Sequence, residues 1–99
     1  GILIPTVAHA GDGNLHPNFV YNDEEVPEHI WNAADAIFRK AISLGGTLTG
    51  EHGVGLLKRQ WLIDELGQSQ TKLQWQIKKV FDPNNILNPG KVFDPEHFN

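Results

Sequence analysis

The sequence predicts an α+β domain, and three observations carry that prediction. Its 99 residues suit a chain with one modest hydrophobic core. Near its beginning, two β-rich runs flank an Asp12-Gly13 turn signal. After Glu24 the apolar positions recur at threes and fours, which indicates helix. The expected order is two strands, a helix, a short strand, two helices and an irregular tail.

The first two elements should form a β-hairpin. Residues Ile2–Val7 are apolar and partly β-branched, so they predict a buried strand. A second β-rich run extends from Asn18 to Tyr21. A type I′ turn at Asp12-Gly13 would join them, because aspartate and glycine tolerate the positive φ that this turn requires.

The first helix should follow from Glu24, with apolar positions continuing to Leu44. Pro27 is tolerated in a first turn, and Gly45-Gly46 should end the helix. A short strand is expected at Thr47–His52, before a glycine-rich loop.

Two further helices are expected in the second half of the chain. One spans Lys58–Leu66 and is closed by Gly67. Lys58-Arg59 is interpreted as a solvated pair, which follows the glycine loop and could instead meet an anion. Ser69 is the expected N-cap of the other, and Asp82-Pro83 ends it. Its predicted buried face consists of Leu73, Ile77, Val80 and Phe81. The tail, 84–99, should wrap over a surface.

Composition restricts the function classes. With 8 Lys and Arg against 12 Asp and Glu, the net charge of −4 argues against a nucleic-acid partner. The absence of cysteine excludes disulfides and thiolate metal sites, so any metal must be held by His, Asp or Glu. A cytoplasmic location is expected. The chain opens with Gly1 before an apolar run and contains no methionine, so we expect an excised fragment of a longer protein.

Two histidines flank the predicted turn. If Asp12-Gly13 is a two-residue turn, paired residues have numbers that sum to 25, and His9 lies directly opposite His16. Their Cβ atoms would then be about 5 Å apart, close enough for both imidazoles to bind one ion. A looser loop would keep the histidines near each other but less rigidly paired. Asn18 would lie on the same face.

A third candidate ligand lies in the sequence Gly50-Glu51-His52-Gly53-Val54-Gly55. The glycines suggest backbone drawn close to something bound. With Glu51 as a ligand, the site would hold two histidines and one carboxylate, which is a common open metal site. His52 would then be a candidate general base, since a histidine titrates near working pH. Because strand neighbours point to opposite faces, Glu51 and His52 require irregular backbone.

Each feature also has a simpler explanation. The histidines could be a hydrogen-bonded strand pair, and the glycine segment could be an ordinary loop with solvated charges. Taken together, three motifs resemble the C-terminal region of FAD-linked oxidases of the vanillyl-alcohol-oxidase type, in the branch that holds glycolate oxidase, the D-lactate dehydrogenases and D-2-hydroxyglutarate dehydrogenase. The motifs are His9–His16, Gly50–Gly55 and Asn85–Lys91.

The resemblance implies roles for individual residues. His9, His16 and Glu51 match the ligands of a divalent metal such as zinc, and His52 is similar to the family's proton acceptor. Asn18 matches a substrate contact. Asn14 and the turn beginning at Asn88 resemble elements near the flavin. The resemblance also implies the C-terminal part of a ferredoxin-like substrate domain, covering about the last fifth of such a protein.

The implied reaction is the oxidation of a 2-hydroxy acid. His52 would remove the hydroxyl proton while the C2 hydride passes to FAD, which the upstream domain of the same full-length chain would bind. The isolated fragment should be inactive. Partner oxidase or iron–sulfur subunits, and peripheral membrane association of the full-length complex, are further implied possibilities. Two rival hypotheses are a metal-dependent hydrolase and a non-catalytic interaction module.

Overall fold

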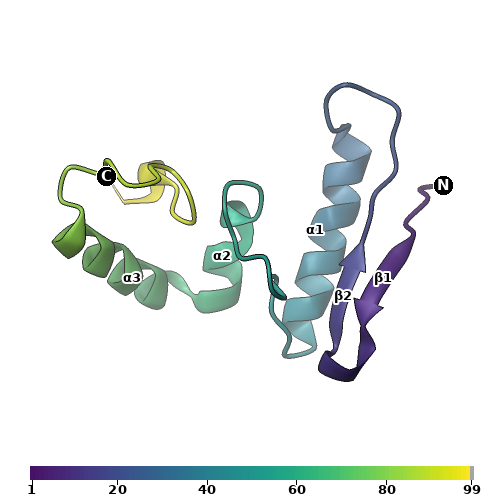
Figure 1. Ribbon diagram of the computed structural model, residues 1–99, viewed down its shortest axis with the longest axis horizontal. Coiled ribbons are helices and arrows are strands. Elements are labelled where there is room, and N and C mark those ends of the chain that lie inside the picture. Colours follow the sequence, from purple (N-terminus) through teal and green to yellow (C-terminus); the bar gives the residue numbers. More distant parts are fainter. Residues whose placement is uncertain (99) are drawn as a thin grey trace. The chain divides into compact units, whose positions relative to one another are not determined.

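A computed structural model describes residues 1–98 and has the expected α+β composition (Figure 1). The chain divides into two compact units, one of residues 1–51 and one beginning at residue 52. The first unit contains a two-stranded sheet and helix α1 (Glu28–Ser43), and the second contains helices α2 (Arg59–Leu66) and α3 (Gln68–Phe81). No helix in the described part of the chain is long and apolar enough to cross a membrane.

The first unit opens with an antiparallel hairpin of β1 (Thr6–His9) and β2 (Asn14–Pro17). The expected two-residue turn is wrong. A short 3₁₀ turn, η1 (Ala10–Asp12), and Gly13 connect the strands instead. Gly13 has φ of 69° and its N–H donates to the Ala10 carbonyl at 3.2 Å. Glycine adopts this left-handed conformation without steric cost, so it closes the connection.

The regular strands lie closer to the connection than the sequence predicted. The predicted runs nevertheless pair with each other, because the Asn18 N–H donates to the Pro5 carbonyl at 3.0 Å. The Val20 N–H donates to the Leu3 carbonyl at 3.1 Å. Backbone pairing therefore continues past the ends of β1 and β2 along the predicted segments.

Helix α1 (Glu28–Ser43) runs alongside β2 in Figure 1, and Ile30 and Ala34 are its buried residues. It begins later than the expected Glu24. Pro27 is extended, with ψ of 155°, and proline also disfavours helical backbone in the residue before it. The helix ends where predicted, at a left-handed Gly45 with φ of 81°.

The short strand predicted at Thr47–His52 is wrong. Within the described residues the sheet consists of β1 and β2, and this segment has irregular backbone. A strand requires a partner whose backbone groups complete its hydrogen bonds, and neither edge of the hairpin pairs with this segment. Leu48, which is only 4 % exposed, anchors the segment by burial instead.

In the second unit, α2 (Arg59–Leu66) buries Trp61 and Leu62. Helix α3 (Gln68–Phe81) follows at once, separated only by Gly67. The C-terminal ends of both helices match the prediction, and Gly67 lies between the helices with φ of 83°. The predicted N-cap is wrong, because Ser69 lies inside the first turn and Gly67 occupies the capping position.

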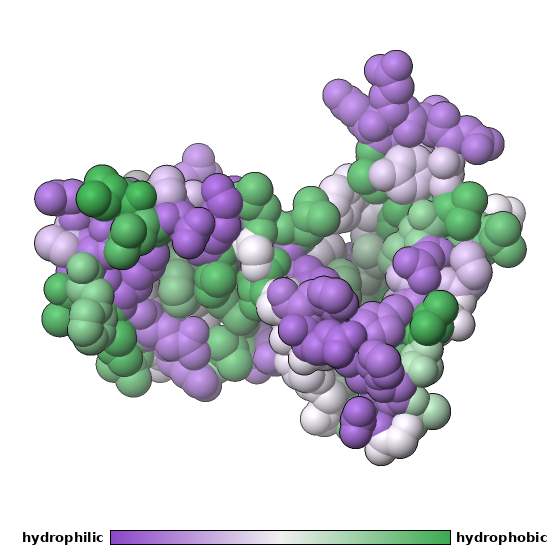
Figure 2. All heavy atoms as spheres, viewed as in Figure 1, coloured by the Kyte–Doolittle hydropathy of each residue, from purple (hydrophilic) through white to green (hydrophobic). Residues whose placement is uncertain are grey.

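The predicted buried face of α3 is wrong. The four residues are 51–80 % exposed: Leu73, Ile77, Val80 and Phe81. The helix instead turns Trp75 toward the tail, where this ring stacks on Phe98 with centroids 5.0 Å apart. Phe93 meets the same indole edge-on at 5.9 Å. Figure 2 shows the hydrophobic side chains that this orientation leaves at the surface of α3 and the tail.

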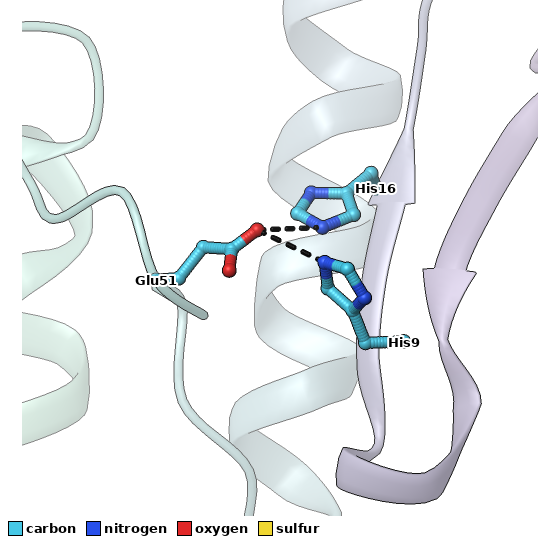
Figure 3. A group of neighbouring side chains, drawn as sticks. All are labelled: His9, His16 and Glu51. Carbon is cyan, nitrogen blue, oxygen red and sulfur yellow. Dashed lines mark hydrogen bonds and ion pairs between the residues drawn. The ribbon is translucent and has the colours of Figure 1, made fainter.

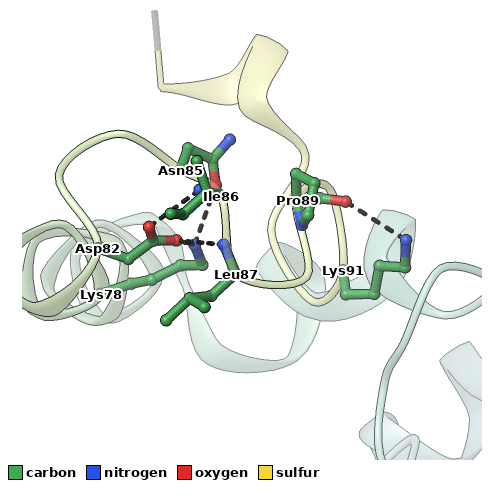
Figure 4. A network of polar contacts seen from close by, with 7 residues as sticks. All are labelled: Lys78, Asp82, Asn85, Ile86, Leu87, Pro89 and Lys91. Atoms are coloured by element: carbon green, nitrogen blue, oxygen red, sulfur yellow. Dashed lines mark hydrogen bonds and ion pairs between the residues drawn. The ribbon is translucent and has the colours of Figure 1, made fainter.

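The Asp82 carboxylate, just after α3, accepts hydrogen bonds that hold the following residues in place (Figure 4). Asp82 is 5 % exposed and accepts a hydrogen bond from the Lys78 ammonium at 2.6 Å. It also accepts the backbone N–H groups of Ile86 at 2.9 Å and Leu87 at 3.0 Å. Lys78 donates a second bond to the Asn85 side chain at 2.9 Å. The tail is otherwise irregular, apart from the 3₁₀ turn η2 (Pro95–His97).

These contacts make stability depend on pH. The hydrogen bond from Lys78, followed by the Ile86 N–H, holds the pKa of the Asp82 carboxyl below its usual range. A carboxyl whose pKa is lower in the folded state stabilises the fold above its unfolded pKa of about 4. That contribution is lost as pH falls through the folded value. We predict that Asp82→Asn lowers the unfolding free energy in urea at neutral pH, and that the difference from wild type shrinks in acid.

The matched control is Asp35→Asn. Asp35 contacts the exposed Arg39 side chain at 3.0 Å on the surface of α1, where ion pairs contribute little. It should therefore change the unfolding free energy only slightly at either pH. A difference between wild type and Asp82→Asn that is equal at neutral and acid pH would contradict the prediction.

Candidate metal centre

Three side chains of the first unit converge on one point: His9, His16 and Glu51 (Figure 3). His9 ends β1, His16 lies in β2, and Glu51 comes from the irregular segment after α1. The Oε1 atom of Glu51 lies 3.2 Å from His9 Nε2 and 3.3 Å from His16 Nε2. The three potential ligand atoms all lie within 4.8 Å of one another.

The hairpin register explains why the two histidines meet. His9 pairs with Asn14, and His16 pairs with Val7, so the paired numbers sum to 23 rather than the predicted 25. The histidines are therefore diagonal neighbours, and the prediction that they lie directly opposite is wrong. Because side chains alternate along a strand, a shift of two leaves both on one face. Their ring centroids are 5.4 Å apart with planes at 86°.

Glu51 reaches the hairpin because the residue before it is glycine. A Cβ atom added to Gly50 would overlap the side-chain amide of Asn14. Asn14 lies in β2 and is the backbone partner of His9. The segment that carries Glu51 therefore contacts the hairpin at Asn14. The absence of a side chain at Gly50 permits that close approach. Sequence reasoning noticed this glycine but did not identify its contact.

The predicted irregular backbone at Glu51-His52 is confirmed, since both residues lie in a bend. Gly53 and Gly55 follow with φ of 84° and 57°, values that side chains rarely allow. His52 itself is exposed. Its role as the proton acceptor stays a prediction.

The other candidate residues have defined backbone settings. Asn18 donates its amide to the carbonyls of Pro5 at 3.2 Å and His16 at 3.0 Å, so its side chain is fixed beside a histidine strand. Asn88 has φ of 43° and begins the predicted turn, in which the Lys91 N–H donates to the Asn88 carbonyl at 3.2 Å. Asn14 contacts Gly50 as described.

The cluster has the donor types that a divalent metal binds, and two of its donor separations can be compared with those of a zinc site. Zinc binds histidine nitrogen and carboxylate oxygen at about 2.0–2.2 Å, so neighbouring tetrahedral ligands lie about 3.3 Å apart. The two nitrogen–oxygen distances given above match that separation. The side chains of His9 and Glu51 are half exposed, at 55 % and 50 %, which leaves one side accessible to a small ligand. Hydrogen-bonded histidine–glutamate pairs would show similar distances.

Comparison with known proteins adds independent findings. The sequence model described as "FAD linked oxidases, C-terminal domain" matches residues 1–92. The chain is 50 % identical over 95 residues to glycolate oxidase subunit GlcD of Bacillus subtilis, covering 93 % of this chain and 20 % of that protein. It is 45 % identical over 87 residues to the mitochondrial D-lactate dehydrogenase (cytochrome) 1 of Saccharomyces cerevisiae, covering 88 % and 15 %.

A third relative is the D-lactate dehydrogenase of Archaeoglobus fulgidus, which is 47 % identical over 93 residues, covering 93 % of this chain and 20 % of that protein. The chain thus spans no more than a fifth of the length of these three relatives.

The contact of Gly50 with Asn14 generates a prediction. Gly50→Ala should destabilise the chain by about 1 kcal/mol, because the new methyl group displaces the Asn14 amide. In an Asn14→Ala background the space is free, and the same substitution should cost less than about 0.5 kcal/mol. Urea unfolding of the four variants of this double-mutant cycle measures the coupling.

Gly11→Ala is the matched control, because a Cβ atom at Gly11 would meet nothing within 4 Å. It should leave stability nearly unchanged. Equal costs of Gly50→Ala in the two backgrounds would show that Asn14 does not occupy this space.

Proposed function

This chain belongs to the FAD linked oxidases, C-terminal domain family, and on that premise we propose that it is the metal- and substrate-binding region of an FAD-dependent 2-hydroxy-acid dehydrogenase. The observation that carries the proposal is the convergence of His9, His16 and Glu51. Relatives named glycolate oxidase and D-lactate dehydrogenase support the substrate class. The reaction is a property of the proposed full-length protein.

His9, His16 and Glu51 would hold a divalent metal, with zinc as the first choice. Two neutral imidazoles and one carboxylate suit zinc and leave coordination positions open. When bound, such an ion supplies positive charge beside the substrate and lowers the pKa of its hydroxyl group. The diagonal histidine pair and the close approach at Gly50 support this assignment, because they hold the three side chains near one another.

His52 would accept the hydroxyl proton at a ring nitrogen. It directly follows a proposed ligand, on backbone that the glycines after it allow to bend. An imidazole nitrogen that carries a lone pair can accept a proton from a substrate hydroxyl group. Asn18, held beside β2 by its two hydrogen bonds, would orient the substrate.

FAD would be bound mainly by another domain of the same full-length protein. When bound, the flavin supplies the acceptor for the C2 hydride. Asn14 and Asn88 would contribute contacts from this chain. Four exposed hydrophobic residues lie on one face of α3, and such a face favours association with another domain: Leu73, Ile77, Val80 and Phe81. We propose that the FAD domain packs on this face. We further propose that the full-length protein is cytoplasmic.

The first test of this proposal is metal binding. Zinc titration of the wild-type chain, followed by calorimetry, should give a saturable site with one ion per chain. His16→Ala and Glu51→Gln should each weaken binding at least about tenfold, because loss of a ligand exceeds the effect of losing a neighbouring contact.

His29→Ala is the matched control, since His29 is an exposed histidine in the first turn of α1. It should bind zinc as wild type does. Equal zinc affinity in wild type and His16→Ala would show that the assigned ligands are wrong.

The second test concerns the reaction. In the full-length flavoprotein, a panel of 2-hydroxy acids should bleach the flavin absorption. His52→Ala should retain its metal and flavin but reduce the flavin about 10²–10⁴-fold more slowly, because the proton acceptor is lost. Stopped-flow absorption measures this rate directly.

His97→Ala serves as control, because His97 lies in the exposed tail turn. Loss of metal from His52→Ala would make His52 a ligand rather than the base.

A full-length protein without flavin that hydrolyses a substrate in a zinc-dependent way would favour a metallohydrolase instead.

A further inference from the structure

The segment from Asn85 to Val92 has unusual backbone. Among the described residues, all three non-glycine positions with positive φ lie here: Asn85 at 51°, Asn88 at 43° and Val92 at 66°. Asparagine tolerates this conformation, whereas β-branched valine rarely adopts it. Such conformations persist only where surrounding contacts impose them, and they concentrate at ligand-binding and catalytic segments.

Asp82 fixes the first half of this segment through the hydrogen bonds described above. Its second half is tied to the glycine loop that continues from His52. The Val92 N–H donates to the Gly55 carbonyl at 2.7 Å. Arg59, the first residue of α2, donates from Nη1 to the Gly90 carbonyl, also at 2.7 Å.

The Arg59 side chain is not the solvated group that the sequence suggested. It is 29 % exposed, and its Nη2 lies 3.9 Å from an Asp94 carboxylate oxygen. A Cβ atom on Gly90 would lie 3.4 Å from Nη1, so the turn passes close to the guanidinium. The planar, multi-donor guanidinium can donate to the Gly90 carbonyl while its other end faces the Asp94 carboxylate, which the single ammonium of lysine does less well.

We propose that Arg59 is a positioning residue: it holds the 88–91 turn through the Gly90 carbonyl, and Val92, the next residue of the tail, bonds the Gly53–Gly55 loop. This inference rests on the proposed function, in which Asn88 lies near the flavin and His52 accepts the proton. The loop begins at the residue after His52, and Arg59 follows its end by four residues. One side chain would thereby set both the flavin contact and the backbone next to the base.

The test uses the flavin-loaded full-length protein with Arg59→Met, Arg59→Lys and the control Arg39→Met. Arg39 is an exposed arginine paired with Asp35 on α1. Removal of a charged hydrogen bond at a partly buried position should raise the FAD dissociation constant of Arg59→Met about 10- to 100-fold. At saturating FAD and substrate, flavin reduction should still be about tenfold slower, because the loop beside His52 is displaced.

Arg59→Lys should show smaller losses in the same two quantities, and Arg39→Met should match wild type. Zinc content and melting temperature, measured on the same samples, report whether the fold is retained. If Arg59→Met does not fold, Arg59→Lys decides. A folded Arg59 variant with wild-type FAD affinity and reduction rate overturns the inference alone. A wild-type protein that holds no FAD overturns the proposed function, and this inference with it.

Discussion

The pairing of Asn14 with His9 is the constraint on which the rest of the candidate site depends. It sets the hairpin register, and the register places His16 diagonally from His9 on the same face of the strands. The same asparagine contacts Gly50, where only a residue without a side chain can approach. Asn14 therefore both aligns the two histidines and allows the residue after Gly50, Glu51, to lie beside them.

The tail after α3 also depends on a few polar contacts, which hold its backbone in otherwise unfavourable conformations. Asp82 satisfies two backbone N–H groups, while Gly55 accepts another and Arg59 binds a carbonyl. Little apolar burial is available to this segment, because Ile86 and Leu87 are exposed. Hydrogen bonds to charged groups are stronger than neutral ones, so a short segment can be fixed with few of them.

Sequence reasoning succeeded where a local rule decides the outcome. Glycines 45 and 67 mark helix ends through their backbone freedom, and strand alternation puts both histidines on one face whichever even shift the register takes. It failed where distant partners decide. The apolar face of α3 is readable from its periodicity, but the Trp75–Phe98 contact that turns this face outward is not. Likewise, the composition of residues 47–52 favours a strand, but it cannot show that this segment does not join the sheet of β1 and β2.

The chemical difference between a metal centre and a hydrogen-bonded cluster lies in one proton on each ring. Both His9 Nε2 and His16 Nε2 face the same Glu51 oxygen. As hydrogen bonds, both contacts require a proton on Nε2. As metal ligands, both nitrogens must present a lone pair, which moves the proton of each neutral ring to Nδ1. A carboxylate oxygen has two lone pairs and can accept from both rings, so the two arrangements differ in where the ring protons lie and not in the residues that they use. The half-exposed side chains of His9 and Glu51 leave one side of this cluster open to solvent. In either case, the hairpin register and the close approach at Gly50 bring the three side chains together.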